Sequence, residues 1–238
     1  MKKITVDIII PVYYGNVDEI EPSIKKQIPF YNKHLKDYNW RIVIGVNGKK
    51  DKILDLAKKL SKKYKNVKYH YTSKPGRGAT LKDSWVNTNA NIVSYMDVDL
   101  STNLRCFPRL LNEFKKGYDV VVGSKYISGA NIQRIPLRYI ISKFYNKVFT
   151  KLFLGARFSD AQCGFKSMRK DVAVKLMPKI KDDGWFWDTE MLYLAQKYKY
   201  KVREIPVDWV EDPNSGVKMT KTIILFLRNM ISLRLRKL

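Results

Sequence analysis

The order of apolar runs and amphipathic stretches in the first half of the chain is the feature that most limits its fold. Strands that alternate with helices predict a mostly parallel sheet with helices on its faces, and nearly continuous apolar strands predict that both faces are covered. We therefore expect a mostly parallel α/β fold. The predicted strands are residues 4–12, 41–46, 67–71, 92–96 and 120–122, and the predicted helices are residues 18–35, 51–63, 78–88 and 104–114.

Polar or glycine-rich segments follow four of these predicted strands. They occupy residues 12–15, 47–48, 74–78 and 97–99. Ligands of parallel sheets bind beyond the carboxyl ends of the strands, where such segments meet. We therefore expect the four segments to form one site along one edge of the sheet.

Asp97 and Asp99 are the clearest chemical signal at this edge. Residues i and i+2 of an extended segment point the same way, so the two carboxylates can converge where the strand at 92–96 ends. Two like charges held together are costly unless a cation lies between them, and Mg²⁺ or Mn²⁺ binds carboxylates and completes its shell with phosphates. The alternative is a pair of solvated turn aspartates; the preceding strand and the basic segment at 74–78 favour the metal site.

The net charge of the chain is +24, from 46 basic and 22 acidic residues. Such a charge favours a polyanionic partner, either nucleic acid or an anionic membrane. The two cysteines lie far apart and the chain has only two histidines, which argues against a disulfide framework, a zinc site or a histidine-based triad. We see no leader-like segment and no apolar run of ~18–20 residues, so we expect an intracellular protein that does not cross the membrane.

Two basic amphipathic stretches in the second half suit a membrane surface. Lysines repeat every four residues from 143 to 151 beside an apolar face, and residues 217–238 contain six basic and no acidic residues. Each stretch is either a solvated helix or an interfacial helix in the headgroup layer, and the presence of two favours the second. We expect a catalytic domain at residues 1–212 and a membrane-interfacial helix at 213–238. The residues of the first stretch are Leu137, Ile140, Ile141, Lys143, Phe144, Lys147, Val148, Lys151 and Leu152.

In their order and spacing, these segments resemble the family 2 glycosyltransferases of the GT-A fold, over residues 4–212. The likeness is closest to the synthases that make dolichyl-phosphate mannose and dolichyl-phosphate glucose. The resemblance implies a metal-dependent, inverting hexosyltransferase, using Mg²⁺ or Mn²⁺, that moves a sugar from a UDP-glucose-like donor or GDP-mannose to dolichyl or polyprenyl phosphate. It also implies a peripheral protein on the cytoplasmic face of an anionic membrane, with no nucleic-acid partner.

The resemblance assigns one group of residues to the donor. The D-x-D motif places Asp97 on the ribose side and Asp99 on the metal, with Ser101 at a third metal position. The basic segment at 74–78 suits a diphosphate, and a segment like that of the glucose-synthase branch places two carboxylates near the sugar, although Asp188 also suits a helix N-cap. The implied donor residues are Pro11, Tyr13, Asn47, Lys74, Arg77, Asp97, Val98, Asp99, Asp188 and Glu190.

A second group is assigned to the acceptor phosphate. Lys125 stands where the family has an arginine, Arg138 and Ser142 lie four residues apart, and Gln162 belongs to the element that closes the acceptor side. A lipid monophosphate has a second pKa near ~6, so it is a nucleophile at neutral pH without a strong base. The implied catalytic residues are Asp99, Asp188 and Arg138.

Other functions remain open from the sequence. One is transfer to a soluble glycan or protein. Another is nucleic-acid binding through aromatic residues between the cations, although this leaves Asp97 and Asp99 without a role. A dinucleotide oxidoreductase is disfavoured because no G-x-G-x-x-G follows the first strand. The segment at 187–190 favours UDP slightly over GDP.

Overall fold

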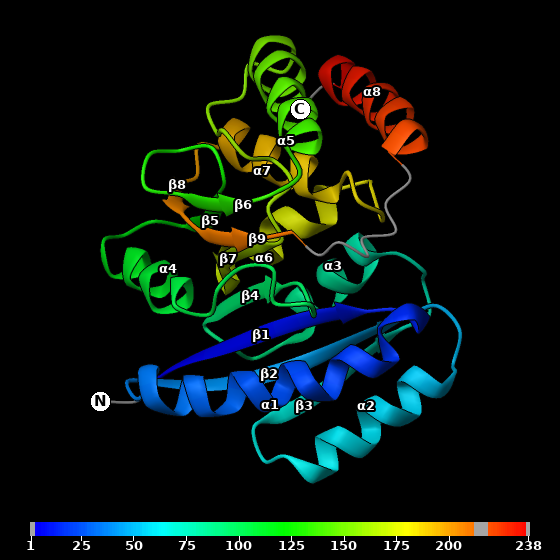
Figure 1. Cartoon of the computed structure of the whole chain (residues 1–238), viewed down its shortest axis with the longest axis vertical. Helices are drawn as coiled ribbons and strands as arrows, with labels where there is room; N and C mark the ends of the chain where they lie inside the picture. The colour runs from blue at the N-terminus through cyan, green and yellow to red at the C-terminus, as the bar shows by residue number, and fades with distance from the viewer. Residues whose placement is uncertain (1–2, 212–218, 237–238) are drawn as a thin grey trace.

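A computed structural model of the chain describes residues 3–211 and 219–236, and its centre is a seven-stranded sheet (Figure 1). The strand order is β3-β2-β1-β4-β7-β5-β8, and β7 alone runs antiparallel to its neighbours in this sheet. The predicted, mostly parallel α/β fold is therefore confirmed. The strands are β1 (Ile4–Val12), β2 (Tyr38–Asn47), β3 (Val67–Thr72), β4 (Ile92–Met96), β5 (Val120–Ser124), β7 (Phe165–Arg169) and β8 (Val202–Pro206).

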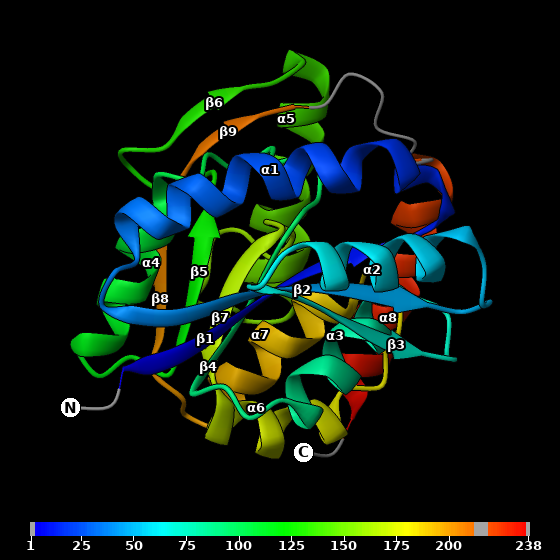
Figure 2. The same cartoon turned by 90° about the horizontal axis from the view of Figure 1, so that it is seen from below.

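Helices cover both faces of this sheet, as Figure 2 shows. Alternate residues of a strand point to opposite faces, so Ile8 and Ile10 join one core cluster while Ile9 joins the other. The first cluster contains α1 (Val17–His34), α2 (Lys52–Lys63) and α4 (Cys106–Lys115). The second contains α3 (Arg77–Asn87), α6 (Lys170–Leu176), α7 (Trp187–Lys197) and α8 (Met219–Leu235).

The elements predicted in the first half are all present, and their ends differ from the prediction by three residues or fewer. The second half is more regular than its sequence indicates. It contains α5 (Pro136–Phe144), which continues as the π-helical segment η2 (Tyr145–Phe153). Two short helical segments are also present: η1 (Tyr14–Asn16) near the start of the chain and η3 (Met177–Lys179) after α6.

A second, two-stranded sheet lies above the carboxyl edge of the main sheet. It pairs β6 (Asn131–Gln133) with β9 (Asp208–Val210). Strand β9 also binds the segment after β4: the Asn103 amide donates to the Asp208 carbonyl at 2.9 Å, and the Val210 amide donates to the Ser101 carbonyl at 2.9 Å. The small sheet therefore fixes the backbone next to Asp99.

Helix α8 packs on the second core through Phe226, Met230 and Leu233, while Ile231 and Leu235 remain exposed. The predicted boundary between residues 212 and 213 lies outside the described residues, so the division into two domains stays a prediction. Within the described ranges, none of the helices combines the length and the apolar character needed to cross a bilayer.

The packing of α8 predicts a difference between its two faces. Met230→Ala removes a fully buried side chain and is expected to lower the free energy of unfolding by about 2–5 kcal/mol. Ile231→Ala, on the exposed face of the same helix, is the matched control and is expected to change it by less than about 0.5 kcal/mol. Urea unfolding followed by circular dichroism measures both, and equal midpoints would show that α8 does not belong to the core.

Candidate active site

The polar segments at the carboxyl edge of the sheet converge as predicted. The Asn47 side-chain amide donates to the Val12 carbonyl at 3.3 Å, and its oxygen accepts from the Gly76 amide at 3.0 Å. Arg77 Nη1 lies 3.5 Å from Asp97 Oδ1. Asn47 therefore joins the end of β1 to the basic segment, and Arg77 joins the basic segment to the D-x-D motif.

The basic segment is packed against a loop that the sequence did not predict. A side chain at Gly76, whose φ is +122°, would place its Cβ 2.1 Å from the Asp183 carbonyl oxygen. That carbonyl accepts from the Ala79 amide at 3.1 Å, and the Asp183 carboxylate pairs with Lys74 and Lys82. The glycine thus makes room for the Asp183 backbone. The Gly76 and Ala79 amides bind Asn47 and Asp183 within the protein, and the predicted contact of residues 74–78 with a diphosphate stays a prediction.

The side chains of the D-x-D motif differ in their surroundings. Asp99 is exposed and accepts a hydrogen bond from the Ser101 amide at 2.9 Å, whereas the Asp97 side chain is 35% exposed. Burial of the carboxyl group raises the pKa of Asp97 to about 6; Arg77 opposes this shift and Asp99 adds to it. The Val98 side chain packs in the first core, so Val98 presents only its backbone at the edge.

These donors fit a hard cation that shares its shell with a substrate. The described part of the chain contains no group of three or more His, Cys, Asp or Glu side chains arranged to hold a metal ion. Two carboxylates with the diphosphate of a donor suit Mg²⁺ or Mn²⁺, which rarely takes a cage made of protein alone. A cation bound there would favour the charged form of Asp97 and so oppose the rise in its pKa that burial and Asp99 cause.

Gly164 leaves the space that the Asp97 carboxylate fills. A Cβ at Gly164 would lie 1.7 Å from Asp97 Oδ2, far inside van der Waals contact. Only the smallest residue therefore leaves space for the carboxylate in its present position.

A buried cluster of charges lies beneath Arg77. Asp188 is fully buried, its Oδ1 is 2.9 Å from Lys166 Nζ, and it also accepts hydrogen bonds from Tyr95 and Arg77. The Arg77 guanidinium also lies over the Trp185 ring, 4.5 Å from its centroid. Asp188 is thus no N-cap, since Phe186 holds that position, and it orients Arg77 from below. The sequence prediction missed Tyr95 and Lys166 because nothing local pairs them with a carboxylate so far along the chain.

Glu190 lies apart from the D-x-D motif. It accepts hydrogen bonds from the Lys181 and Asp182 amides at 2.9 Å each and from Nη1 of Arg236, the residue after α8, at 2.9 Å. Asn229 of α8 also donates to Asp182 Oδ2 at 2.9 Å. Glu190 therefore holds the loop before α7 and the end of α8, and its assignment to the donor remains untested.

Pro11 is the penultimate residue of β1 and Tyr13 follows its end, so both lie at the carboxyl edge as predicted. Pro11 is half-buried and the Tyr13 ring is exposed. The Lys74 side chain is largely exposed and lies 2.5 Å from Asp183. These residues have surface available for a ligand, but their predicted contacts with a nucleotide stay predictions.

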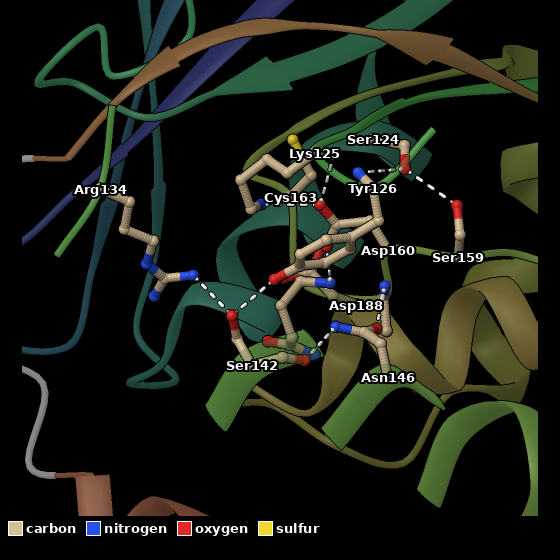
Figure 3. Close-up of polar contacts among 12 residues, drawn as sticks. Ser124, Lys125, Tyr126, Arg134, Ser142, Asn146, Ser159, Asp160, Cys163 and Asp188 are labelled. Carbon is tan, nitrogen blue, oxygen red and sulfur yellow. Dashed lines mark hydrogen bonds and ion pairs between the residues drawn. The ribbon is translucent and has the colours of Figure 1, made fainter. Parts of the chain in front are cut away.

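Two of the predicted acceptor residues, Lys125 and Ser142, lie in a second polar cluster (Figure 3). Figure 3 shows the Tyr126 hydroxyl and Arg134 pointing toward Ser142, at 2.5 Å and 2.7 Å from its Oγ. Arg138 Nη1 lies 3.3 Å from Glu211 Oε1. The sequence prediction missed Tyr126, Arg134 and Glu211, although the four-residue spacing of Arg134 and Arg138 was a usable signal.

Lys125 and Gln162, both predicted to bind the acceptor, bind side chains of the protein itself. Lys125 is 7% exposed, and its Nζ lies 2.8 Å from Asp160 Oδ2. Although burial opposes the shift, Asp160 raises the pKa of Lys125, and Lys125 holds the pKa of Asp160 below its ordinary value. Gln162 donates to the Thr189 hydroxyl at 2.7 Å. The pairing with Asp160 leaves Lys125 little charge to offer a phosphate.

A mostly parallel sheet carries two aspartates and two clusters of basic side chains at its carboxyl edge, where ligands of such sheets bind. The chain belongs to glycosyl transferase family 2, whose sequence model matches residues 7–177.

Relatives and solved structures agree with this assignment. The chain is 28% identical to the glycosyltransferase AglD of Haloferax volcanii over 93% of its own length and 35% of the relative's. It is 24% identical to the dolichyl-phosphate beta-glucosyltransferase ALG5C of Trichomonas vaginalis over 88% of its length and 65% of the relative's. The chain thus spans less than two thirds of either relative.

The fold matches glucosyl-3-phosphoglycerate synthase from Mycobacterium tuberculosis, solved with UDP. The TM-score is 0.68 at 13% identity, over 98% of this chain and 79% of that one. Another structure of that enzyme, with Mn²⁺, UDP and phosphoglyceric acid, gives a TM-score of 0.62 at 13% identity over 97% and 77%. This likeness confirms the GT-A fold.

Replacement of Gly164 tests whether the position of Asp97 matters. Gly164→Ala must displace the Asp97 carboxylate and is expected to lower the rate of sugar transfer on the order of 100-fold, because small misplacements at a reacting centre are costly. Gly184→Ala is the matched control, since its Cβ would meet only Asp182 Oδ1, at an ordinary 3.5 Å. Initial rates, with circular dichroism to establish folding, measure the effect. Equal rates for the two variants would show that this position of Asp97 is not required.

Proposed function

We propose that the chain transfers a hexose, with inversion, from a nucleotide sugar to the phosphate of dolichyl or polyprenyl phosphate. The observation that carries the proposal is the connection between the two polar clusters. Trp209 of β9 bridges to Thr102, three residues after Asp99, and its ring lies 5.4 Å from the Arg134 guanidinium carbon. One short strand therefore adjoins both the D-x-D segment and the cluster around Ser142. The dolichyl-phosphate glucosyltransferases among its relatives support this acceptor.

On the donor side, the D-x-D carboxylates would hold Mg²⁺ or Mn²⁺, which would neutralise the charge of the departing nucleoside diphosphate. Asp99 is exposed at the edge and Asp97 is fixed by Arg77 and Gly164. Pro11, Tyr13 and Lys74 border the same edge and would contact the nucleotide. Structures of the related fold with Mn²⁺ and UDP support this choice of cofactor and a uridine donor.

On the acceptor side, Arg138 and Ser142 would orient the phosphate for in-line attack on the anomeric carbon. A phosphate monoester is largely dianionic at neutral pH, so its oxygen attacks without a general base. The residues of the acceptor cluster supply charge and hydrogen bonds to hold the nucleophile, and holding two anionic substrates together is the main task of the site. This reaction inverts the configuration at the anomeric carbon.

A screen of donors and acceptors tests the proposal. UDP-glucose, UDP-N-acetylglucosamine and GDP-mannose are each supplied with a short polyprenyl phosphate, and the glycolipid product is measured by mass spectrometry. We expect product with one donor, loss of product with EDTA and recovery with Mg²⁺ or Mn²⁺. Asp99→Ala is expected to lower the turnover by at least about 100-fold because charge stabilisation at the leaving group is lost.

The same screen contains the outcomes against the proposal. Transfer only to a soluble glycan or protein would refute the lipid acceptor. Turnover of Asp99→Ala near that of the wild-type chain would refute the metal assignment.

We also propose that the end of the molecule formed by α5, η2 and α8 lies on the cytoplasmic surface of an anionic membrane. These helices are neighbours in Figure 1, and the rings of Tyr145 and Phe226 lie 5.7 Å apart. Large apolar side chains remain exposed on them, up to 75% at Leu152 and 77% at Leu235. Apolar side chains beside lysines and arginines suit the headgroup layer of anionic lipids. The exposed apolar residues here also include Leu137, Ile140, Phe144, Ile224 and Ile231.

Vesicle binding tests this surface. We expect the chain to sediment with vesicles that contain anionic lipid and to be released as salt rises, because the lysines contribute through screened charges. Ile140→Glu with Leu152→Glu is expected to abolish sedimentation, since both side chains are exposed. Val174→Glu, at an exposed position of α6, is the matched control and should not change the sedimentation. Undiminished binding by the double variant would refute this surface.

A further inference from the structure

We infer that Arg134 is a further residue of the acceptor site and forms with Arg138 a pair of guanidinium groups that binds a phosphate monoester. The resemblance assigned Arg138 and Ser142 to this phosphate and left Arg134 without a role. The inference rests on the proposed function, and it identifies which cations of this chain do the binding.

Arg134 already touches the residue assigned to the phosphate. Its Nη1 donates to Ser142 Oγ at 2.7 Å, and its Nε donates to Glu211 Oε1 at 3.2 Å. The guanidinium plane is also held over the Trp209 ring, and the side chain is only 18% exposed. An arginine fixed in three directions loses little further freedom when it binds a ligand.

Glu211 shows that the two arginines can share one anion. Its Oε1 lies 3.2 Å from Arg134 Nε and 3.3 Å from Arg138 Nη1, while its Oε2 accepts from the Ile135 amide at 3.0 Å. One oxygen held between two guanidinium groups is an arrangement that suits a phosphate oxygen, and Arg134 also reaches the Ser142 hydroxyl. Glu211 thus neutralises part of the positive charge of Arg134 and Arg138 and holds their guanidinium groups in position.

The balance of charge also calls for a second arginine. The ion pair of Lys125 with Asp160 is buried, so its two charges cancel within the protein. With Lys125 committed, Arg138 alone would face a phosphate that carries about −1.5 to −2 at neutral pH. Arg134 supplies the missing positive charge, next to Ser142.

The experiment compares acceptor affinity among variants of the full chain. Arg134→Ala is expected to raise the acceptor KM about tenfold or more and to leave the donor KM unchanged. The same change is expected for Arg138→Ala. Arg134→Lys is expected to fall between, because lysine keeps the charge but cannot reach Ser142 and Glu211 together. Arg157→Ala, at an exposed arginine on the same basic half of the chain, is the matched control.

Glu211→Gln separates a binding role from a structural one. If Arg134 binds phosphate, removing the carboxylate that competes for it is expected to lower the acceptor KM about threefold. If Arg134 serves only to pair with Glu211, Glu211→Gln raises the acceptor KM as Arg134→Ala does, and the inference is overturned. Thermal unfolding of every variant checks that the fold is intact, and Arg134→Lys keeps the test valid if Arg134→Ala does not fold.

Direct binding keeps this test separate from that of the proposed function. Calorimetric titration with a short polyprenyl phosphate in detergent, and with glycerol 3-phosphate, gives the dissociation constant of each monoester and distinguishes a lipid from a soluble acceptor. Weaker binding of either monoester to Arg134→Ala than to Arg157→Ala supports the inference even if no sugar is transferred. Equal binding to these two variants overturns it, whether or not the wild-type chain is active.

Discussion

The buried carboxylate of Asp188 is the interaction on which the active-site edge depends. It lies out of contact with water between Lys166 of β7, Tyr95 of β4 and Arg77 of α3. A buried charge that loses one of its partners costs about 3–5 kcal/mol, so these elements hold each other in place. Arg77, fixed in this way from below, in turn contacts Asp97 on the open side. The position of Asp97 in the D-x-D motif thus depends, through Arg77, on a carboxylate that is buried beneath the site.

Two clusters of opposite character share this edge. The D-x-D motif presents carboxylates, which suit a cation and a diphosphate, while the cluster around Ser142 presents arginines, which suit a phosphate. Strand β9 connects them through hydrogen bonds to residues 101 and 103 and through the Trp209 ring. In the proposed function, this separation of charge between the clusters would let the protein hold two anionic substrates side by side. Helices with exposed apolar residues lie next to the arginine side.

Much of this arrangement was predictable because it follows from local patterns. Strands β1 and β4 begin and end where their apolar runs do, and the polar segments after parallel strands had to meet at one edge. The antiparallel β7 and the partners of Asp188, Lys125 and Glu190 were not predictable. The direction of β7 is set by its pairing with β4 and β5. The partners depend on ion pairs between residues far apart in the sequence, as for Lys125 with Asp160 and Glu190 with Arg236. Residue type alone does not reveal whether such a charge faces a ligand or a neighbour.

The hydrogen bonds between α8 and the loop before α7 have a mechanical consequence. Asn229 binds Asp182, and Arg236 binds Glu190. Asp183, the residue after Asp182, fills the space left by Gly76. A continuous set of contacts therefore connects α8 to the turn that carries Arg77. If α8 rests on a lipid surface as proposed, a shift of that helix would strain this turn, and membrane contact would then be coupled mechanically to the proposed sugar-nucleotide site.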